Sequence, residues 1–291
     1  GTRWYIRNAR ATQKISLQVQ RAPLSVIRGG RGRPVSVTDD TDDVLEGSKV
    51  TAPNGASGRL LIQPSDLQGA APLASIQLYD ESELVLSSAR SPRFSASPHP
   101  HKIGLQLDRG RLRINVFGQS DRPTVAEVYT ADGLITLTEG SYEVKVNTMT
   151  ETAVRYGQAE ATNESGDAML LGPRERCLLD ADRIEGPLPA ARNLVVNGNF
   201  ERPLENGWES YGEQTDPTQP PGRVAVTGAP VGSEERRVVE FYRNAVNHAE
   251  IGIHQDIGYD VRDFTSLELY MTLRIVSENI LGLGGCGTLG S

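Results

Sequence analysis

The chain is poor in the residues that usually build metal sites and disulfide frameworks. Its 291 residues include only two cysteines, Cys177 and Cys286, and four histidines. No Cys-x-x-Cys pair or Cys/His cluster has zinc spacing, which excludes a structural zinc site of that kind and a disulfide framework. A single bridge between the two cysteines stays open. Cys177 ends a strand-like run, so we expect a small, buried, unreactive side chain there.

Short catalytic motifs are also missing. The sequence contains no G-x-S-x-G, no H-E-x-x-H and no P-loop motif. The glycine-rich stretch Gly282–Gly287 lacks the strand-to-helix context in which glycine loops hold phosphates. His99 and His101 flank Pro100 with no third metal ligand nearby. We therefore expect a protein that is not an enzyme.

The net charge and the hydropathy limit which classes of partner this chain can have. The formal net charge of -7 provides no general basic field for nucleic acid, so none is expected. No run reaches the roughly 18 apolar residues of a membrane span, and no signal peptide stands at Gly1. Two explanations stay open: a cytoplasmic protein, or a chain whose targeting segment was removed. The aromatic and basic residues of "GTRWYIRNARA" are typical of the flank of a spanning helix, so we expect membrane contact only through a segment preceding residue 1.

The sequence is rich in strand and turn patterns. Apolar residues alternate with polar ones in short runs, and Gly or Pro turn signals recur about every 8–12 residues. Residues 103–118 predict a hairpin with its turn at Asp108–Gly110, and residues 75–86 predict two strands around Asp80 and Glu81. The most regular run is residues 266–277, where one face would carry Leu267, Leu269, Met271, Leu273 and Ile275. An all-β protein follows.

A break divides these strands into two groups. Residues 184–193 ("IEGPLPAARN") contain two prolines and a glycine, which disfavour helix and central strand and predict a linker. We divide the chain into residues 1–22, a membrane-proximal segment with the first strand, residues 23–187, a β domain, and residues 188–291, a second β domain.

The first domain resembles the FecR-type extracytoplasmic domain. The resemblance depends on the order of "DVLEGSKVTAPNGASGRLLI", "SIQLYDESELVL", "IGLQLDRGRLRINV" and "VYTADGLITLTEGSYEVKV". It implies a β sandwich or short β-roll outside the cytoplasm. In that family's regulators, a cytoplasmic anti-sigma segment and one spanning helix precede the domain.

The second domain resembles galactose-binding-like jelly rolls of the carbohydrate-binding module type. "NLVVNGNFERPLENGW" is similar to their first strand, and "AEIGIHQDIGYDVRDFTSLELYMTLRI" to their middle. The resemblance implies a β-sandwich jelly roll that is partial here, because such modules need roughly 130–150 residues. An unfinished sheet exposes edges that can pair with another chain.

Candidate site residues all lie in this second domain. Aromatic rings that stack on sugars and polar groups that bind hydroxyls identify a ligand-binding set: Trp208, Tyr211, Arg243, His254 and Gln255. Trp208 has an alternative place in the core. The resemblance implies a Ca²⁺ ligand at Glu201.

These observations favour a non-catalytic bacterial envelope protein, secreted or displayed at the cell surface, in which a FecR-like domain presents a jelly roll that binds a glycan or another surface polymer. One alternative is a structural protein that assembles into filaments or layers by strand pairing with itself or another envelope protein. Another is a transmembrane regulator of the anti-sigma type.

Overall fold

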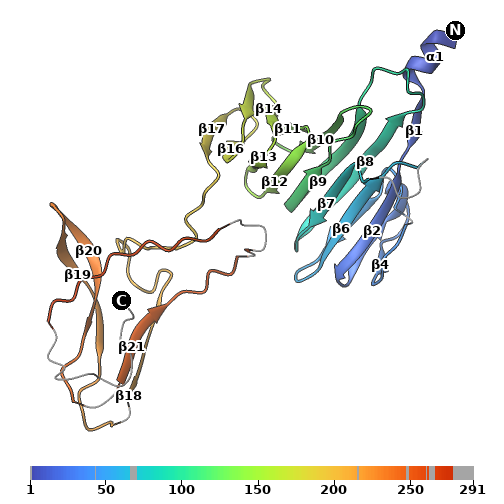
Figure 1. Ribbon diagram of the computed structural model, residues 1–291. Helices are drawn as coiled ribbons and strands as arrows, with labels where there is room; N and C mark the ends of the chain where they lie inside the picture. Colours follow the sequence, from blue (N-terminus) through green and yellow to red (C-terminus); the bar gives the residue numbers. More distant parts are fainter. Residues whose placement is uncertain are drawn as a thin grey trace. The chain divides into compact units, whose positions relative to one another are not determined.

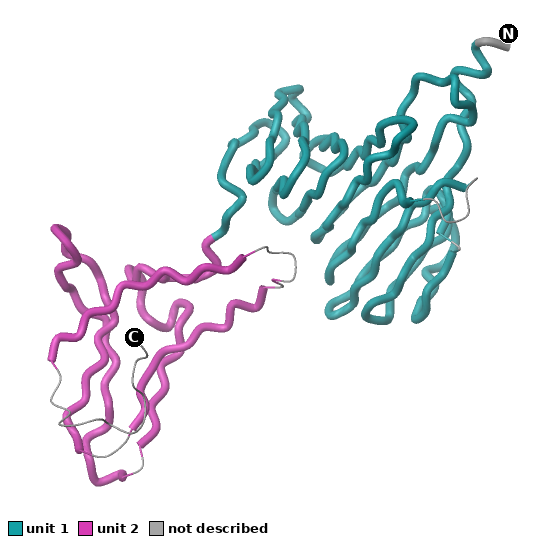
Figure 2. Tube along the Cα trace, viewed as in Figure 1, with its two compact units in different colours: residues 1–192 teal, residues 193–291 magenta. Residues whose placement is uncertain are grey.

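The computed structural model describes residues 2–42, 44–65, 71–214, 216–246, 249–259, 261 and 266–277. The chain forms two compact units, Gly1–Arg192 and Asn193–Ser291 (Figure 2). The division falls at residues 192 and 193, and residues 1–22 belong to the first unit. Both units are built from strands, which confirms the all-β prediction. Within the described ranges, no helix has the length and apolar character needed to cross a membrane.

The first unit begins with a short helix, α1 (Thr2–Asn8), and continues almost entirely as strands (Figure 1). Its first half contains β1 (Arg10–Thr12), β2 (Lys14–Arg21), β3 (Leu24–Ile27), η1 (a 3-10 turn, Arg28–Gly30), β4 (Val35–Val37), β5 (Lys49–Ala52), β6 (Ser57–Gln63), β7 (Ala74–Leu78) and β8 (Ser82–Pro92). Its second half contains β9 (His101–Val116), β10 (Thr124–Thr130), β11 (Gly133–Leu137), β12 (Gly140–Val146), β13 (Thr150–Tyr156), β14 (Ala159–Asn163), β15 (Ala168–Leu171), β16 (Glu175–Leu179) and β17 (Ile184–Pro189).

These strands form two sheets that share β9. The first sheet contains β1, β3, β4, β5, β8, β10, β11, β14 and β15. The second sheet contains β2, β6, β7, β12, β13, β16 and β17. Inward-facing residues of both sheets form one hydrophobic core. Such a two-layer arrangement buries the apolar face of each sheet against the other.

Strand β9 corrects the predicted hairpin at residues 103–118. These residues form one long strand that pairs with β8 before Gly110 and with β7 and β12 from Gly110 onward. Gly110 has a φ of +91°, and a Cβ there would lie 2.4 Å from the Cα of Ser82. A glycine in this conformation bends the strand from one sheet into the other, so the turn signal marks a corner and not a chain reversal.

The strands on either side of Asp80 and Glu81 also differ from a simple hairpin. Both β7 and β8 are present where the sequence predicts them, but they pair with β9 at different places and lie in different sheets. Ser82 closes this corner: its hydroxyl bonds with the backbone N–H and C=O of Arg111. The local pattern therefore predicted the strands and missed their partners.

The N-terminal strand β2 is a full member of the core. It pairs with β6 over its length and buries Ile15 and Leu17. Cys177 is buried on β16 as predicted, and burial raises the pKa of its thiol to about 11. Cys286 and the glycine-rich stretch at residues 282–287 lie outside the described residues.

The predicted linker at residues 184–193 is wrong in its first part. Ile184–Pro189 forms β17, which pairs antiparallel with β16 through a bulge between Arg176 and Leu178. Within the described residues β17 has no second neighbour, and an edge strand tolerates proline because one of its sides needs no ladder hydrogen bonds.

The second unit contains four described strands in two antiparallel pairs. β18 (Glu209–Gln214) pairs with β21 (Ala249–His254), and β19 (Arg223–Val231) pairs with β20 (Glu234–Tyr242). These strands confirm the predicted runs around residues 223–242 and 249–254. The two-sheet jelly roll stays a prediction.

Residues 266–277 do not form the predicted core strand. The structure assigns no strand there, and the side chains of Leu267, Leu269, Met271, Leu273 and Ile275 are 61–76% exposed. Alternation alone cannot bury a face, because a strand also needs a neighbour for its backbone and a layer to cover it.

Candidate ligand-binding face on the β18–β21 sheet

The register of β18 and β21 places an exposed tyrosine over a glycine. Tyr211 lies directly opposite Gly252, and a Cβ at Gly252 would be 2.5 Å from the Cζ of the Tyr211 ring. The ring therefore occupies the space that a side chain at position 252 would fill. Tyr211 is nevertheless 41% exposed, so it presents part of its ring to solvent.

Hydrogen-bonding groups surround this ring. The Tyr211 hydroxyl donates to Oε1 of Glu250 at 3.0 Å, and this bond to a carboxylate raises the pKa of Tyr211. The rings of Tyr211 and His254 are 5.9 Å apart at 52°. His254 in turn lies 3.2 Å from the carboxylate of Glu209, measured from Nε2 to Oε2. The pattern of alternation puts all four side chains on one face.

We call Glu209, Tyr211, Glu250 and His254 the tyrosine face. Its chemistry is a flat apolar surface with acceptors and one imidazole at its edges. Glu213 lies opposite Glu250 in the register and adds a second acidic position to this face. A face of this kind suits a ligand with C–H groups for the ring and hydroxyl or N–H groups for the carboxylates.

Trp208 directly precedes β18, and its side chain contacts residues of the 197–208 loop. Its indole N–H donates to the backbone carbonyl of Asn197 at 3.1 Å, and its ring is 5.8 Å from the Phe200 ring. The side chain is half-buried. These contacts hold the 197–208 loop together, and both interpretations of Trp208, as a core residue and as a ligand contact, stay predictions.

Gln255 is also used by the fold. Its Oε1 accepts from the backbone N–H of Val196 at 2.8 Å, and its Nε2 donates to the carbonyls of Val196 and Gly207. The amide thus ties the end of β21 to the start of the second unit. Its polar atoms thus have backbone partners, and a ligand contact of Gln255 stays a prediction.

The remaining two candidates are not brought to the tyrosine face. Arg243 follows directly after β20, which belongs to the other sheet of the unit. Glu201 is exposed in the loop after Phe200. Among the described residues, no group of three or more His, Cys, Asp or Glu side chains is arranged to hold a metal ion. A Ca²⁺ ligand at Glu201 stays a prediction.

Two residues of this site were missed from the sequence: Glu250 and Gly252. A glycine within an alternating strand is the signal that was available, because it marks close approach of another group. Which group approaches depends on the pairing of residues about forty positions apart, and local patterns do not contain that information.

A second constellation lies in the first unit. Nδ1 of His101 is 2.5 Å from the Ser91 hydroxyl, and Nε2 is 3.6 Å from Oδ1 of Asp121. Burial lowers the pKa of His101, against the opposing effect of Asp121. Ser91 and His101 are both buried, so a substrate cannot approach the serine hydroxyl, and the trio links β8, β9 and the β9–β10 loop.

Comparisons with known proteins give little. No protein-family model matches the chain, and no curated protein matches it. Two crystal structures of a "putative anti-sigma factor" from Parabacteroides distasonis ATCC 8503, at 2.50 Å and 1.65 Å resolution, are similar to part of it. Their identities are 18% and 17% and their TM-scores 0.32 and 0.33; each match covers 47% of this chain and 57% of the other. The chain thus spans just over half of their length, and TM-scores this low support no assignment.

Proposed function

We propose that this is a non-catalytic protein of the bacterial cell envelope whose second unit binds a glycan through the tyrosine face. The observation that supports this proposal most is the exposed Tyr211 ring, which occupies the space over Gly252 and contacts Glu250 and His254. A ring held by the backbone loses little conformational entropy on binding, which favours a weak polar ligand such as a sugar.

The ligand would make two kinds of contact, stacking on the Tyr211 ring and hydrogen bonds to the polar side chains around it. The C–H groups of a sugar would stack on Tyr211. Its hydroxyl groups would donate hydrogen bonds to Glu209 and Glu250, and His254 would accept a hydrogen bond from them or donate one to their oxygens. The carboxylates make this face acidic, so neutral or amino sugars suit it better than uronic or sialic acids. Arg243, from the other sheet, stays a proposed contact of a longer ligand.

The first unit supplies a rigid support in this proposal. The order of its sequence features is the reason to propose a FecR-type domain. We place this domain outside the cytoplasm, either secreted or anchored through a segment preceding residue 1. An envelope signalling role of the anti-sigma type is a further proposal that depends on the same resemblance.

The direct test is a glycan array with the labelled full chain. We expect binding to a subset of neutral or amino-sugar glycans, and we expect Tyr211→Ala to weaken it by about tenfold or more, as loss of a stacking ring does. Tyr156→Ala is the matched control, because Tyr156 is an exposed tyrosine of the first unit. Equal binding by the Tyr211 variant, or no binding across a broad array, would contradict the proposal.

A specific observation also favours self-association. The alternating apolar side chains of residues 266–277 are exposed, and an uncovered apolar segment with this alternation is prone to pair with another chain. Analytical ultracentrifugation of the full chain at rising concentration tests this. Replacing Leu269 and Met271 with serine should shift the equilibrium toward monomer; a protein that stays monomeric at high concentration is incompatible with this second function.

A further inference from the structure

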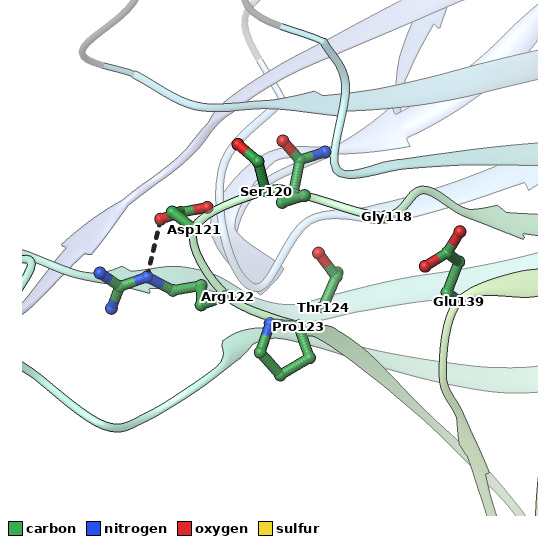
Figure 3. A pocket seen from close by; sticks show the side chains of 8 residues that line it. Gly118, Ser120, Asp121, Arg122, Pro123, Thr124 and Glu139 are labelled. Atoms are coloured by element: carbon green, nitrogen blue, oxygen red, sulfur yellow. Dashed lines mark hydrogen bonds and ion pairs between the residues drawn. The ribbon is translucent and has the colours of Figure 1, made fainter.

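The first unit contains a polar cavity that the proposed glycan site does not use. It has a volume of about 260 Å³ and lies between the loop that joins β9 to β10 and the turn that joins β11 to β12. Its lining is Gly118, Gln119, Ser120, Asp121, Arg122, Pro123, Thr124 and Glu139 (Figure 3). The cavity is open to solvent on one side, so a small ligand group can enter it.

Thr124 contributes a hydroxyl that lacks a partner at the base of this cavity. The residue is 2% exposed, and among the described residues its Oγ1 has no hydrogen-bond partner. Figure 3 shows this hydroxyl pointing into the space between the 118–123 loop and Glu139. A buried hydroxyl without a bond costs about 1–3 kcal/mol, so the site gains when a ligand supplies one.

Glu139 contributes an exposed carboxylate to this cavity. Its carboxylate packs against the backbone of Gly118, where a Cβ would lie 2.4 Å from Oε2. Within the described part of the chain, this carboxylate forms no ion pair. The absence of a side chain at Gly118 therefore leaves the room in which Glu139 faces the cavity.

The other charges of the cavity are already paired with one another. Arg122 donates from Nε to Oδ2 of Asp121 at 2.9 Å, and from Nη1 to the carbonyls of Ser97 and His99. The second oxygen of Asp121 faces His101. The charges of Asp121 and Arg122 cancel each other. The net charge of the cavity is therefore negative, because of Glu139.

We propose that this cavity binds a primary ammonium group on a short apolar stem, such as a small alkylamine or the side chain of a lysine. An ammonium has three N–H donors and no acceptor, which matches the Glu139 carboxylate and the Thr124 hydroxyl as acceptors and leaves one N–H for water. The Pro123 ring offers an apolar wall for the stem. The site lies in the first unit, so it is independent of the glycan proposal.

The test uses the full chain, labelled with ¹⁵N, and n-butylammonium chloride at constant ionic strength. We expect saturable shifts of the backbone amides of Ser120, Thr124 and Glu139, with weak, roughly millimolar affinity, as for a single small polar group. N,N,N-trimethylbutylammonium has the same charge and no N–H donors, so it should not produce saturable shifts. Equal shifts from both cations, or no saturation, would show that only water and bulk salt occupy the cavity and would overturn the proposal.

Three variants refine this test. Glu139→Gln should weaken n-butylammonium binding about tenfold, because a charge-assisted contact becomes neutral. Thr124→Val should weaken it less, while Thr124→Ser, which keeps the hydroxyl, should bind like the original chain. Unchanged affinity of a folded Glu139→Gln variant contradicts the assignment; should a variant misfold, the comparison of the two cations on the unaltered chain still decides.

The source of the ammonium is distinguished by a second titration. Nα-acetyl-lysine methylamide carries the same head on a peptide unit. Binding much tighter than n-butylammonium indicates a lysine side chain of a partner protein, while equal or weaker binding indicates a free small amine.

Discussion

The hydroxyl of Tyr142 accepts a hydrogen bond from the backbone N–H of Gln158 at 3.1 Å, inside the core of the first unit. The same hydroxyl lies 2.9 Å from the carbonyl of Gln158 and 3.1 Å from that of Glu139, to which its single hydrogen can be donated. Tyr142 is fully buried, and burial raises its pKa. One side chain thus joins the β11–β12 turn to the β13–β14 turn.

Removing this hydroxyl should destabilise the first unit. We expect Tyr142→Phe to lower its free energy of unfolding by about 1–3 kcal/mol, because the part-buried hydrogen bonds of this hydroxyl to Gln158 and Glu139 are lost. Urea denaturation followed by circular dichroism measures the loss. Tyr156→Phe is the control, because Tyr156 is half exposed and should change little. A Tyr142→Phe variant as stable as the original chain would show that water replaces the hydroxyl.

The tyrosine face should depend on Gly252. We expect Gly252→Ala to displace the Tyr211 ring and reduce glycan binding, because the new Cβ would overlap the ring. Gly212→Ala on β18 is the matched control, since its Cβ would make an ordinary contact of 3.6 Å with Ile251. ¹H–¹³C spectra of the Tyr211 ring check the displacement. If both alanine variants leave the Tyr211 signals and the array pattern intact, the ring does not depend on the glycine.

Acid should weaken the network around Glu83. Its carboxylate lies 2.6 Å from Nζ of Lys49 and also bonds with Arg109, and the hydrogen bond from Lys49 lowers its pKa from 4.5. A lowered folded-state pKa means that the contribution is complete above pH 4.5 and is lost as the pH falls through the folded value.

Glu83→Gln should therefore destabilise the chain at pH 7, and the difference from the original chain should shrink below pH 4.5. Urea midpoints at pH 7 and at progressively lower pH measure both effects. Glu160→Gln, on the exposed side of β14, is the control. A difference that grows on acidification would contradict the stated sign.

Arg192 should stabilise the end of the first unit. Its Nη2 lies 2.7 Å from Oε1 of Glu143 and 3.0 Å from Oε1 of Glu151, on β12 and β13. Glu143 is buried and retains Arg111 and Arg113 nearby. We expect Arg192→Gln to lower the free energy of unfolding by about 1–3 kcal/mol. This is less than the effect of removing the only partner of a buried carboxylate, because Glu143 keeps two other arginines.

Hydrogen exchange of the β12 and β13 amides in the full chain localises this effect. Arg183→Gln provides the comparison, because Arg183 is mostly exposed and lies 4.0 Å from Glu185. Exposed pairs of this kind contribute little. If these amides are equally protected from exchange in the Arg192 and Arg183 variants, Arg192 does not have the stabilising role stated here.

Several elements of the fold could be predicted because their signals are local. Alternation located β7, β8, β19 and β20, and Cys177 was correctly predicted to be buried. Gly110 was read as a hairpin turn because a positive φ is needed in turns and in strand bends alike. Pro187 was read as a linker because its tolerance in β17 depends on that strand lying at an edge.

The order of residues is enough to predict a succession of short strands, since a two-residue period shows which side of each strand is apolar. The pairing of these strands became known from the folded chain. There, β9 belongs to both sheets, Tyr211 lies over Gly252, and the apolar side chains of residues 266–277 are exposed. Burial and register depend on contacts between segments distant in the chain, and no local pattern of residues specifies its partner.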